Sequence, residues 1–257
     1  MIPLVYLGCP EYFTPDEHSI LARYSGVDPG ADELDRVVAA QWRVCGSSLL
    51  PKSFNALICE AMDLRDAGKV THFAMLHDDI WPDNYWINTL WREMRLTGAD
   101  LVSVVSPIKD QPTYRSSTAI GLKSDPWVVP RYIRPGDRKA LPTTFSGVHV
   151  CGPGEELLVN TGCFLADLRH DWWDEFCGAG GFNFATRITR EPDGSRLSWI
   201  QPEDWRMSRF LAARGAKLAA TYAVRLRHRG QAWWSNYDDA AGMPCVHLDH
   251  PCFSEDT

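Results

Sequence analysis

The amino-acid sequence predicts an α/β protein built on a mostly parallel central sheet. Over the first hundred residues, short apolar runs alternate with segments of helical periodicity, and the apolar runs end abruptly in polar residues. Short apolar runs bounded in this way are typical of buried strands. Helices placed between such strands favour parallel pairing through right-handed crossovers. The chain of 257 residues is long enough for one large α/β domain or two small ones.

Composition narrows the class of protein. Hydrophobic residues make up 45% of the chain and charged residues 23%, which is ordinary for a soluble globular protein. The formal net charge of −7 provides no global attraction to nucleic acid or to an anionic membrane. No apolar run is long enough to span a membrane, and no basic region precedes the short apolar run 2–7. The 8 cysteines include no CxxC pair and are expected to be reduced thiols, so we expect a cytoplasmic protein.

The first half of the chain is expected to alternate strands and helices in a nucleotide-binding unit. Glycines that follow the periodic segments mark the helix ends. The expected elements are a strand at 3–8 ending in a Gly8-Cys9-Pro10 turn, a loop at 11–29, helices at 31–45, 54–64 and 85–96, and strands at 71–76 and 100–105.

The second half is more irregular. Residues 107–154 are rich in Pro, Gly, Ser and Thr and are expected to form loops and hairpins that contact the substrate. The further expected elements are short strands at 127–129 and 147–150, a strand at 157–165, a helix at 171–176, a mobile polar segment at 178–198, a helix at 201–215 and one or two strands at 217–229.

The stretch Thr71 to Asp83, THFAMLHDDIWPD, places two adjacent acids directly after a predicted buried strand. Open α/β sheets bind ligands at this end of their strands. Adjacent carboxylates repel each other unless a cation or hydrogen bonds offset the charge, and a divalent metal carrying a diphosphate would do so. A simpler interpretation is a strand-to-helix turn in which Asp83 is the N-cap of the next helix.

Two later features carry ionisable side chains. Glu203 and Asp204 open a predicted helix, where acids also serve simply to complement the helix macrodipole. His228 lies on the apolar face at the end of a predicted strand, as either a core histidine or a ligand.

Taken in order, these features resemble the GT-A glycosyltransferases, particularly the family-2-like enzymes that use nucleotide-sugar donors, including small phage and bacterial members. The stretch around Asp79 resembles the metal-binding DxD strand of this family, Glu203-Asp204 its ED motif, and His228 followed by Gly230 its final metal-binding histidine. The resemblance also covers Asn160 to Phe164, which is similar to the glycine-containing strand beside the donor sugar, and Leu49 to Asn55, although Phe54 stands where an arginine is expected. It spans about 2–234 and leaves 107–154 uncovered.

The resemblance implies a single GT-A domain at 1–235, with a nucleotide-binding half (1–106) and an acceptor-binding half (107–235), followed by a tail (236–257). It implies that Asp79 and His228 hold Mn²⁺ or Mg²⁺ against the diphosphate of a nucleotide-sugar donor. Asp204, or less readily Glu203, would be the base that accepts the proton of an acceptor hydroxyl, with inversion at the sugar. The residues expected to contact the donor are Gly8, Pro10, Asn55, His77, Asp78, Gly162 and Trp233.

One residue departs from the family pattern. His77 occupies the position of the first DxD acid, where it would bond to the donor, ligate the metal, or mark a degenerate site. The alternative function is therefore a non-catalytic protein that binds a sugar nucleotide. A nucleotidyltransferase is disfavoured because no basic, glycine-rich loop follows the first strand.

The acceptor and the tail stay open at this point. A sugar, a lipid-linked sugar, a protein or a modified DNA base would suit the fold, and Arg225, Arg227 and Arg229 with the basic region 123–139 would meet a phosphate backbone or solvent. In the tail, the side chains of Cys245, His247, His250 and Cys252 are of the types that bind zinc, and the alternative is a surface tail.

Overall fold

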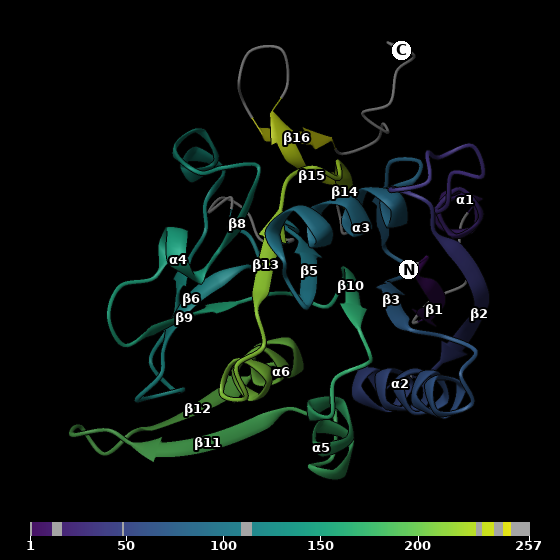
Figure 1. Ribbon diagram of the computed structural model, residues 1–257. Helices are drawn as coiled ribbons and strands as arrows, with labels where there is room; N and C mark the ends of the chain where they lie inside the picture. The colour runs from purple at the N-terminus through teal and green to yellow at the C-terminus, as the bar shows by residue number, and fades with distance from the viewer. Residues whose placement is uncertain are drawn as a thin grey trace.

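The computed structural model describes residues 2–11, 17–47, 49–108, 115–229, 233–238 and 244–247 (Figure 1). In this part of the chain the central sheet has seven strands in the order β2-β1-β3-β10-β5-β13-β8. Their bounds are β1 Leu4–Glu11, β2 Val38–Gly46, β3 His72–Leu76, β5 Leu101–Val104, β8 Thr144–Ser146, β10 Cys163–Asp167 and β13 Leu218–Thr221. Strands β2, β1, β3, β5 and β13 run parallel, whereas β10 and β8 run antiparallel to their neighbours. The predicted α/β class with a mostly parallel sheet is confirmed.

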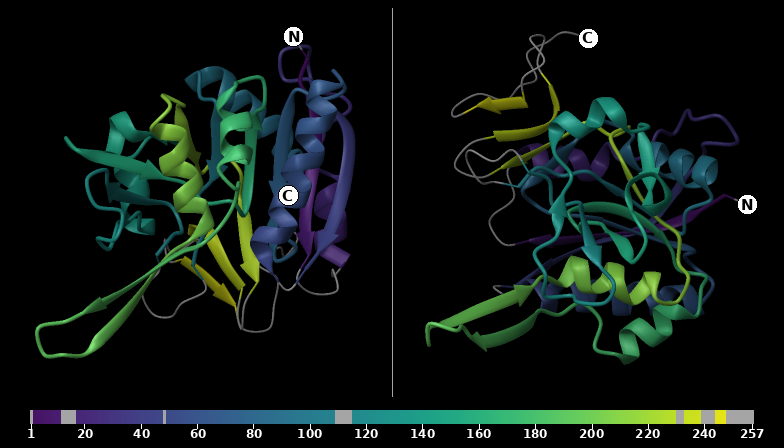
Figure 2. Two further views of the ribbon diagram at one scale, coloured as in Figure 1. Left: turned by 90° about the horizontal axis from the view of Figure 1, so that it is seen from below. Right: turned by 90° about the vertical axis from the view of Figure 1, so that its left-hand side faces the viewer.

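Helices cover both faces of the sheet. Their bounds are α1 Glu17–Tyr24, α2 Leu50–Asp66, α3 Trp86–Thr97, α4 Gly147–Val150, α5 Trp172–Gly178 and α6 Glu203–Ala212, with a 3₁₀ helix at Pro135–Ala140. One apolar core joins α2, α5 and α6 to the sheet, and a second joins α1 and α3 to its other face (Figures 1 and 2). Strands β3 and β5 are therefore buried along their whole length, as their apolar sequences predict.

Three smaller sheets adjoin this core. Strands β16 (Pro244–His247), β15 (Trp233–Asp238), β14 (Leu226–Arg229) and β4 (Ile80–Pro82) form one sheet, and β7 (Arg131–Tyr132), β6 (Ala119–Leu122) and β9 (Glu155–Leu158) form another. Strands β11 (Ala185–Arg190) and β12 (Arg196–Gln201) form a two-stranded hairpin that projects from the body of the molecule (Figure 2). No helix among the described residues is both long enough and apolar enough to traverse a lipid bilayer.

The helices predicted at 54–64, 85–96, 171–176 and 201–215 and the strands at 71–76 and 100–105 are confirmed, with shifted ends. Gly68 and Gly98 follow α2 and α3 with φ of 68° and 64°, a conformation that glycine adopts without steric cost.

Several element predictions are wrong. The helix expected at 31–45 is the edge strand β2, and β1 continues through Gly8, Cys9 and Pro10 instead of turning there. The loop expected at 11–29 contains α1, and the strand expected at 157–165 is divided between β9 and β10. Residues 127–129 form no strand, residues 147–150 form α4, and the segment 178–198, expected to be mobile, contains most of the β11–β12 hairpin.

Candidate functional site

The site is built around the turn that follows β3. The backbone N–H of His77 donates to Gly162 O (2.9 Å), and the N–H of Ile80 donates back to His77 O (3.2 Å). Strand β4 then pairs antiparallel with β14, in a register that sets Ile80 opposite His228. The N–H of Arg229 donates to Asp79 O (2.8 Å). Backbone pairing thus brings His228 beside Asp79, although the two residues are far apart in the sequence.

The side chains of Asp79 and His228 face each other. His228 Nε2 lies 3.5 Å from Asp79 Oδ2. The side chain of His228 is 19% exposed and that of Asp79 is 20% exposed. His228 Nδ1 lies 2.7 Å from the carbonyl oxygen of Pro107. A carbonyl only accepts, so Nδ1 carries a proton, and in the neutral imidazole the lone pair is on Nε2, towards the carboxylate. Two electron-rich atoms at this separation repel unless a proton or a metal cation lies between them.

These two residues fit a divalent cation. Metal–ligand distances of about 2.0–2.2 Å place adjacent ligand atoms of one ion roughly 3 Å apart, close to the 3.5 Å observed. A carbonyl that fixes the tautomer of a ligating histidine is a frequent partner of such sites. Among the described residues no group of three or more His, Cys, Asp or Glu side chains is placed to hold a metal. Asp79 and His228 would therefore need oxygen ligands from a bound molecule or from water to complete the coordination.

Asp78 stands between His77 and Asp79 in the turn. Its side chain is buried and is electrostatically close to Cys9 in β1. Burial raises the pKa of the Cys9 thiol to about 12, against the opposing effect of Arg23 and with smaller contributions from Glu11 and Asp78. Arg23 forms an ion pair with Glu11 at 2.7 Å. The structure therefore groups Asp78 with charged residues at the carboxyl end of β1.

His77 lies against α2. The centroid of its ring is 5.0 Å from that of Phe54, and the ring of Phe54 in turn packs edge-on against Phe182 at 5.3 Å. Phe54 is fully buried. Phe54, at the position where the sequence resemblance leads one to expect an arginine, is thus part of the core and forms an aromatic contact with His77.

Three predicted donor contacts are engaged in the fold. The Asn55 Nδ2 donates to Phe182 O (2.9 Å), and its Oδ1 accepts the Phe182 N–H (2.8 Å). Gly8 lies inside β1, where a Cβ atom would come within 2.9 Å of the Phe73 ring. Pro10 is buried and pairs with Cys45 of β2. Asn55 therefore has a visible structural role, because it ties α2 to the segment that leads into the β11–β12 hairpin.

Replacing Asn55 by alanine is expected to lower the free energy of unfolding by about 1–3 kcal/mol, because the Phe182 N–H and C=O would lose their partner. Chemical denaturation measures the loss. Asn183→Ala is the matched control, since its Nδ2 makes only contacts of 3.5 and 3.3 Å to Gly180 O and Gly181 O. Equal losses in the two variants would contradict the anchoring role of Asn55.

Gly162 allows a close approach between the start of β10 and the turn after β3. A Cβ atom at this position would overlap the Cδ1 of Ile80, the residue that follows Asp79. The N–H of Gly162 donates to Asn160 Oδ1 (3.0 Å), and the Asn160 Nδ2 donates to Val104 O (2.6 Å). The buried Asn160 thus holds the loop that supports the turn.

Gly162→Ala is expected to displace the turn and to destabilise the protein by about 1–3 kcal/mol, the typical cost of overpacking. The distance between the Asp79 and His228 side chains should change as well, because Asp79 moves with Ile80. Thermal unfolding measures the loss of stability, and a crystal structure of the variant measures the displacement. In the control Gly178→Ala, the new Cβ meets nothing within 4 Å, and a similar effect of both variants would refute the steric argument.

Glu203 and Asp204 form the first turn of α6. The Asp204 Oδ1 accepts the backbone N–H of Trp205 (2.7 Å). Burial raises the pKa of Asp204 well above its usual range, and the neighbouring Glu203 carboxylate raises it further. Burial also raises the pKa of Glu203. A carboxyl group with a raised pKa binds a proton more readily, as a general base requires.

A short series of hydrogen bonds connects α6 to His228. Trp205 Nε1 donates to Ser117 O (3.1 Å), and the Ser117 N–H and Oγ–H both donate to Ser106 O (2.8 and 3.1 Å). The next residue, Pro107, provides the carbonyl that binds His228. The structure thus links the first turn of α6 to the Asp79–His228 pair through one bridging segment.

Arg227 does not lie where its sequence pattern predicts. The alternating pattern sets Arg225, Arg227 and Arg229 on one solvent-facing side, but Arg227 is fully buried and only Arg225 is exposed. Strand β14 lies between β4 and β15, with Arg227 opposite Trp81 and Ser235. A shared basic face that contacts a phosphate backbone is therefore excluded for this strand. The local sequence pattern does not predict that the guanidinium of Arg227, one residue from His228, is buried.

The remaining predictions concern the carboxyl-terminal segment. The backbone of Trp233 belongs to β15, but its side chain lies outside the described part of the structure. The same holds for the side chains of Cys245 and His247, and His250 and Cys252 lie wholly outside the described residues.

Comparison with known proteins extends the fold assignment. No family model matches the sequence, and no curated protein matches it. The crystal structure of A197 from STIV superposes with a TM-score of 0.51 at 10% identity, covering 96% of this chain and 95% of that one. GalNAc-T7, solved with UDP, GalNAc and Mn²⁺, gives a TM-score of 0.46 at 10% identity, covering 88% of this chain and 44% of that one. At this identity the likeness to A197 concerns the fold, which this chain shares over nearly its whole length.

Proposed function

We propose that this protein is a metal-dependent glycosyltransferase that moves a sugar from a nucleoside-diphosphate donor to an acceptor hydroxyl. The observation that carries the proposal is the pair formed by Asp79 and His228 after β3. Their side chains face each other at 3.5 Å, with the histidine tautomer set by Pro107 O. This pair lies at the carboxyl end of a strand in a mostly parallel sheet, where such folds bind nucleotides.

Each charged group has a proposed role. Asp79 and His228 would hold Mn²⁺ or Mg²⁺, with further oxygen ligands from the donor diphosphate, and the imidazole ligand would favour Mn²⁺ slightly. The cation, when bound, stabilises the charge that develops on the leaving nucleoside diphosphate. Asp204 accepts the proton of the acceptor hydroxyl as it attacks the sugar, and Glu203 is the second candidate. A base opposite the leaving group gives inversion of the anomeric configuration.

A panel of nucleotide sugars tests the proposal. The protein is incubated with each donor, with and without Mn²⁺, and both the thermal shift and the release of nucleoside diphosphate are measured. The expected result is a Mn²⁺-dependent thermal shift with one class of donor and release of its diphosphate, lost in the presence of a chelator. Absence of both effects with every donor would overturn the proposal.

A second candidate is a sugar-nucleotide-binding protein without turnover. It is favoured by His77, which stands where the sequence resemblance leads one to expect an acid. The ring centroid of His77 lies 5.0 Å from that of Phe54. The same panel distinguishes the two functions, because the binding protein would give a thermal shift without release of diphosphate. His77→Asp would then be expected to introduce turnover, whereas an active transferase would already show it.

A further inference from the structure

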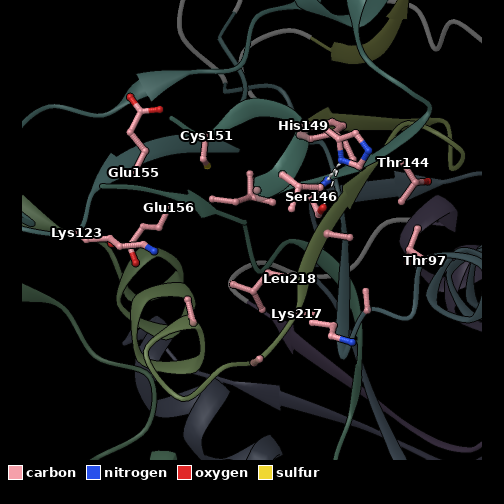
Figure 3. A pocket seen from close by; sticks show the side chains of 18 of the residues that line it. Thr97, Lys123, Thr144, Ser146, His149, Cys151, Glu155, Glu156, Lys217 and Leu218 are labelled. Atoms are coloured by element: carbon pink, nitrogen blue, oxygen red, sulfur yellow. Dashed lines mark hydrogen bonds between the residues drawn. The ribbon is translucent and has the colours of Figure 1, made fainter. Parts of the chain in front are cut away.

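A cavity that neither Asp79 nor His228 lines lies beside α4. It has a volume of about 940 Å³ and opens between α3, α4, β9 and the far end of α6 (Figure 3). Glu203 and Asp204 are in the first turn of α6, whereas Ala212, its last residue, lines the cavity. Ten helical residues span roughly 15 Å. The volume falls within the range of small-molecule sites, about 300–1,000 Å³.

The floor of the cavity is apolar. Phe145, Leu157, Leu218 and Ala219 line it from β8, β9 and β13, and each of these residues is at most 6% exposed. Val148 on α4 lies at its edge and is 89% exposed. An apolar floor beneath an open rim favours a ligand with an apolar body.

Four charged residues line the cavity, and within the described part of the chain the two carboxylates are in ion pairs whereas the two lysines are not. Glu155 accepts the Gly152 N–H (2.7 Å) and lies 3.6 Å from Arg131 Nη2, while Glu156 forms an ion pair with Arg209. Both carboxylates are therefore compensated by arginines. Lys123 and Lys217 also line the cavity, and neither ammonium has an ion-pair partner within the described ranges. Figure 3 shows the two lysines on different sides of the cavity, so the rim offers an ammonium group outside the named ion pairs on each of these sides.

We propose that this cavity binds an amphipathic organic anion, in which an apolar chain or ring carries a carboxylate or phosphate group. The apolar body covers the floor formed by Phe145, Leu157 and Leu218, and the anionic group lies against Lys123 or Lys217. The site is distinct from the proposed donor site and does not depend on the transferase proposal. His149 adds a hydrogen-bond donor at the rim, because its Nδ1 accepts the Ser146 N–H (3.0 Å) and the neutral ring then carries its proton on Nε2.

Cys151 provides a reporter inside the cavity. Its thiol is half-buried on the wall, whereas Cys59 on α2 is exposed and outside the cavity. Alkylation of the whole protein with N-ethylmaleimide, followed residue by residue by mass spectrometry, is measured with increasing decanoate or decyl phosphate. The expected result is slower labelling of Cys151 at unchanged labelling of Cys59. Decanol and inorganic phosphate, which carry one half of the chemistry each, should protect far less.

Variants connect the protection to the proposed contacts. Reversing both rim charges, Lys123→Glu with Lys217→Glu, is expected to weaken protection by decanoate about tenfold, because its one carboxylate loses an exposed ion pair and meets like charge on either side. The control Lys69→Glu changes an exposed lysine outside the cavity and should leave protection unchanged. Ala216→Leu fills the cavity from the α6 end and should abolish protection while the protein stays folded.

Three outcomes would overturn the proposal. The first is that neither decanoate nor decyl phosphate protects Cys151. The second is that Cys59 is protected as strongly as Cys151, and the third is that the charge-reversed and wild-type proteins are protected equally. Protection by inorganic phosphate alone would likewise exclude a role for the apolar floor. If decyl phosphate protects and decanoate does not, the ligand is a phosphate ester; the reverse result identifies a carboxylate.

Discussion

Asp79→Ala is expected to lower donor turnover by about 10²–10³-fold, the loss typical when an electrostatic contact to a developing charge is removed. The carboxylate is one of two protein groups that face the proposed cation, with Oδ2 at 3.5 Å from His228 Nε2. Its removal leaves a single imidazole, which cannot hold Mn²⁺ or Mg²⁺ firmly. The Mn²⁺-dependent part of the thermal shift with donor should therefore disappear together with turnover.

His228→Ala provides the second half of the test. Because both side chains act on the same cation, the double variant should lose little more activity than either single variant. Asp63→Ala, a change of an exposed carboxylate on α2, is the control and should behave as wild type. If Asp79→Ala keeps its Mn²⁺-dependent thermal shift, or if the two losses simply add, the pair does not share one cation.

The elements predicted correctly are those whose local pattern agrees with their burial. The apolar run of β3 is buried at every position, and α3 has its apolar residues Trp86, Ile87, Leu90 and Met94 in the core. The segment 31–45 has apolar residues at a similar spacing, but Leu34 is 72% exposed and Trp42 46% exposed. The spacing of the apolar residues in this segment therefore does not indicate a helix face that is buried in the core. Pairing with β1 selects the strand, and this partner is invisible in a local window.

One missed element did have a local signal. The sequence Glu191-Pro192-Asp193-Gly194 between two runs with β-branched and aromatic residues is typical of a hairpin turn, and Gly194 has φ of 85°. The β11–β12 hairpin could thus have been predicted from sequence, whereas the high polarity of 178–198 favoured an unstructured segment.

For the candidate site, the order of the motifs in the sequence predicts Asp79 and His228 but not the residues that surround and orient them. The strand end at Asp79 and the late His228 were both identifiable. The carbonyl oxygen of Pro107, which fixes the tautomer of His228, lies 121 residues away from it in the sequence. The buried Arg227 directly precedes His228. Both depend on how β14 packs between β4 and β15, which only the folded chain determines. Asn55 shows the opposite case, since a residue expected to contact the donor binds the backbone of Phe182.

Asp204→Asn is expected to lower turnover by about 10²–10⁴-fold, the usual contribution of a general base, and at the same time to stabilise the protein at alkaline pH. Asparagine preserves the shape and the hydrogen bond to Trp205 N–H but cannot accept the acceptor's proton. The wild-type protein should lose the proposed activity as the pH falls through the raised pKa of Asp204, because the base is then protonated.

The stability change has a defined sign. The pKa of Asp204 is higher in the folded than in the unfolded protein, so the unfolded chain loses this proton first as the pH rises. The contribution of Asp204 to wild-type stability is therefore greatest below the unfolded pKa, about 4, and decreases as the pH rises towards the folded pKa. The asparagine of the variant carries no charge at any of these pH values. Thermal unfolding should therefore show little difference from wild type near the acidic end and a higher melting temperature of the variant at pH about 8.

This pairing of effects separates a base from an ordinary helix-capping acid. An acid that only complements the macrodipole is stabilised in its charged form, and its replacement lowers stability at neutral pH. Burial beside Glu203 reverses that balance at Asp204. Glu203→Gln is the matched comparison: its pKa is also raised, so it should stabilise the protein in the same pH range with a smaller loss of turnover. If Asp204→Asn left turnover intact, or if Glu203→Gln caused the larger loss, the proton would be accepted elsewhere; a melting temperature lowered at pH about 8 would instead identify Asp204 as a helix-capping acid.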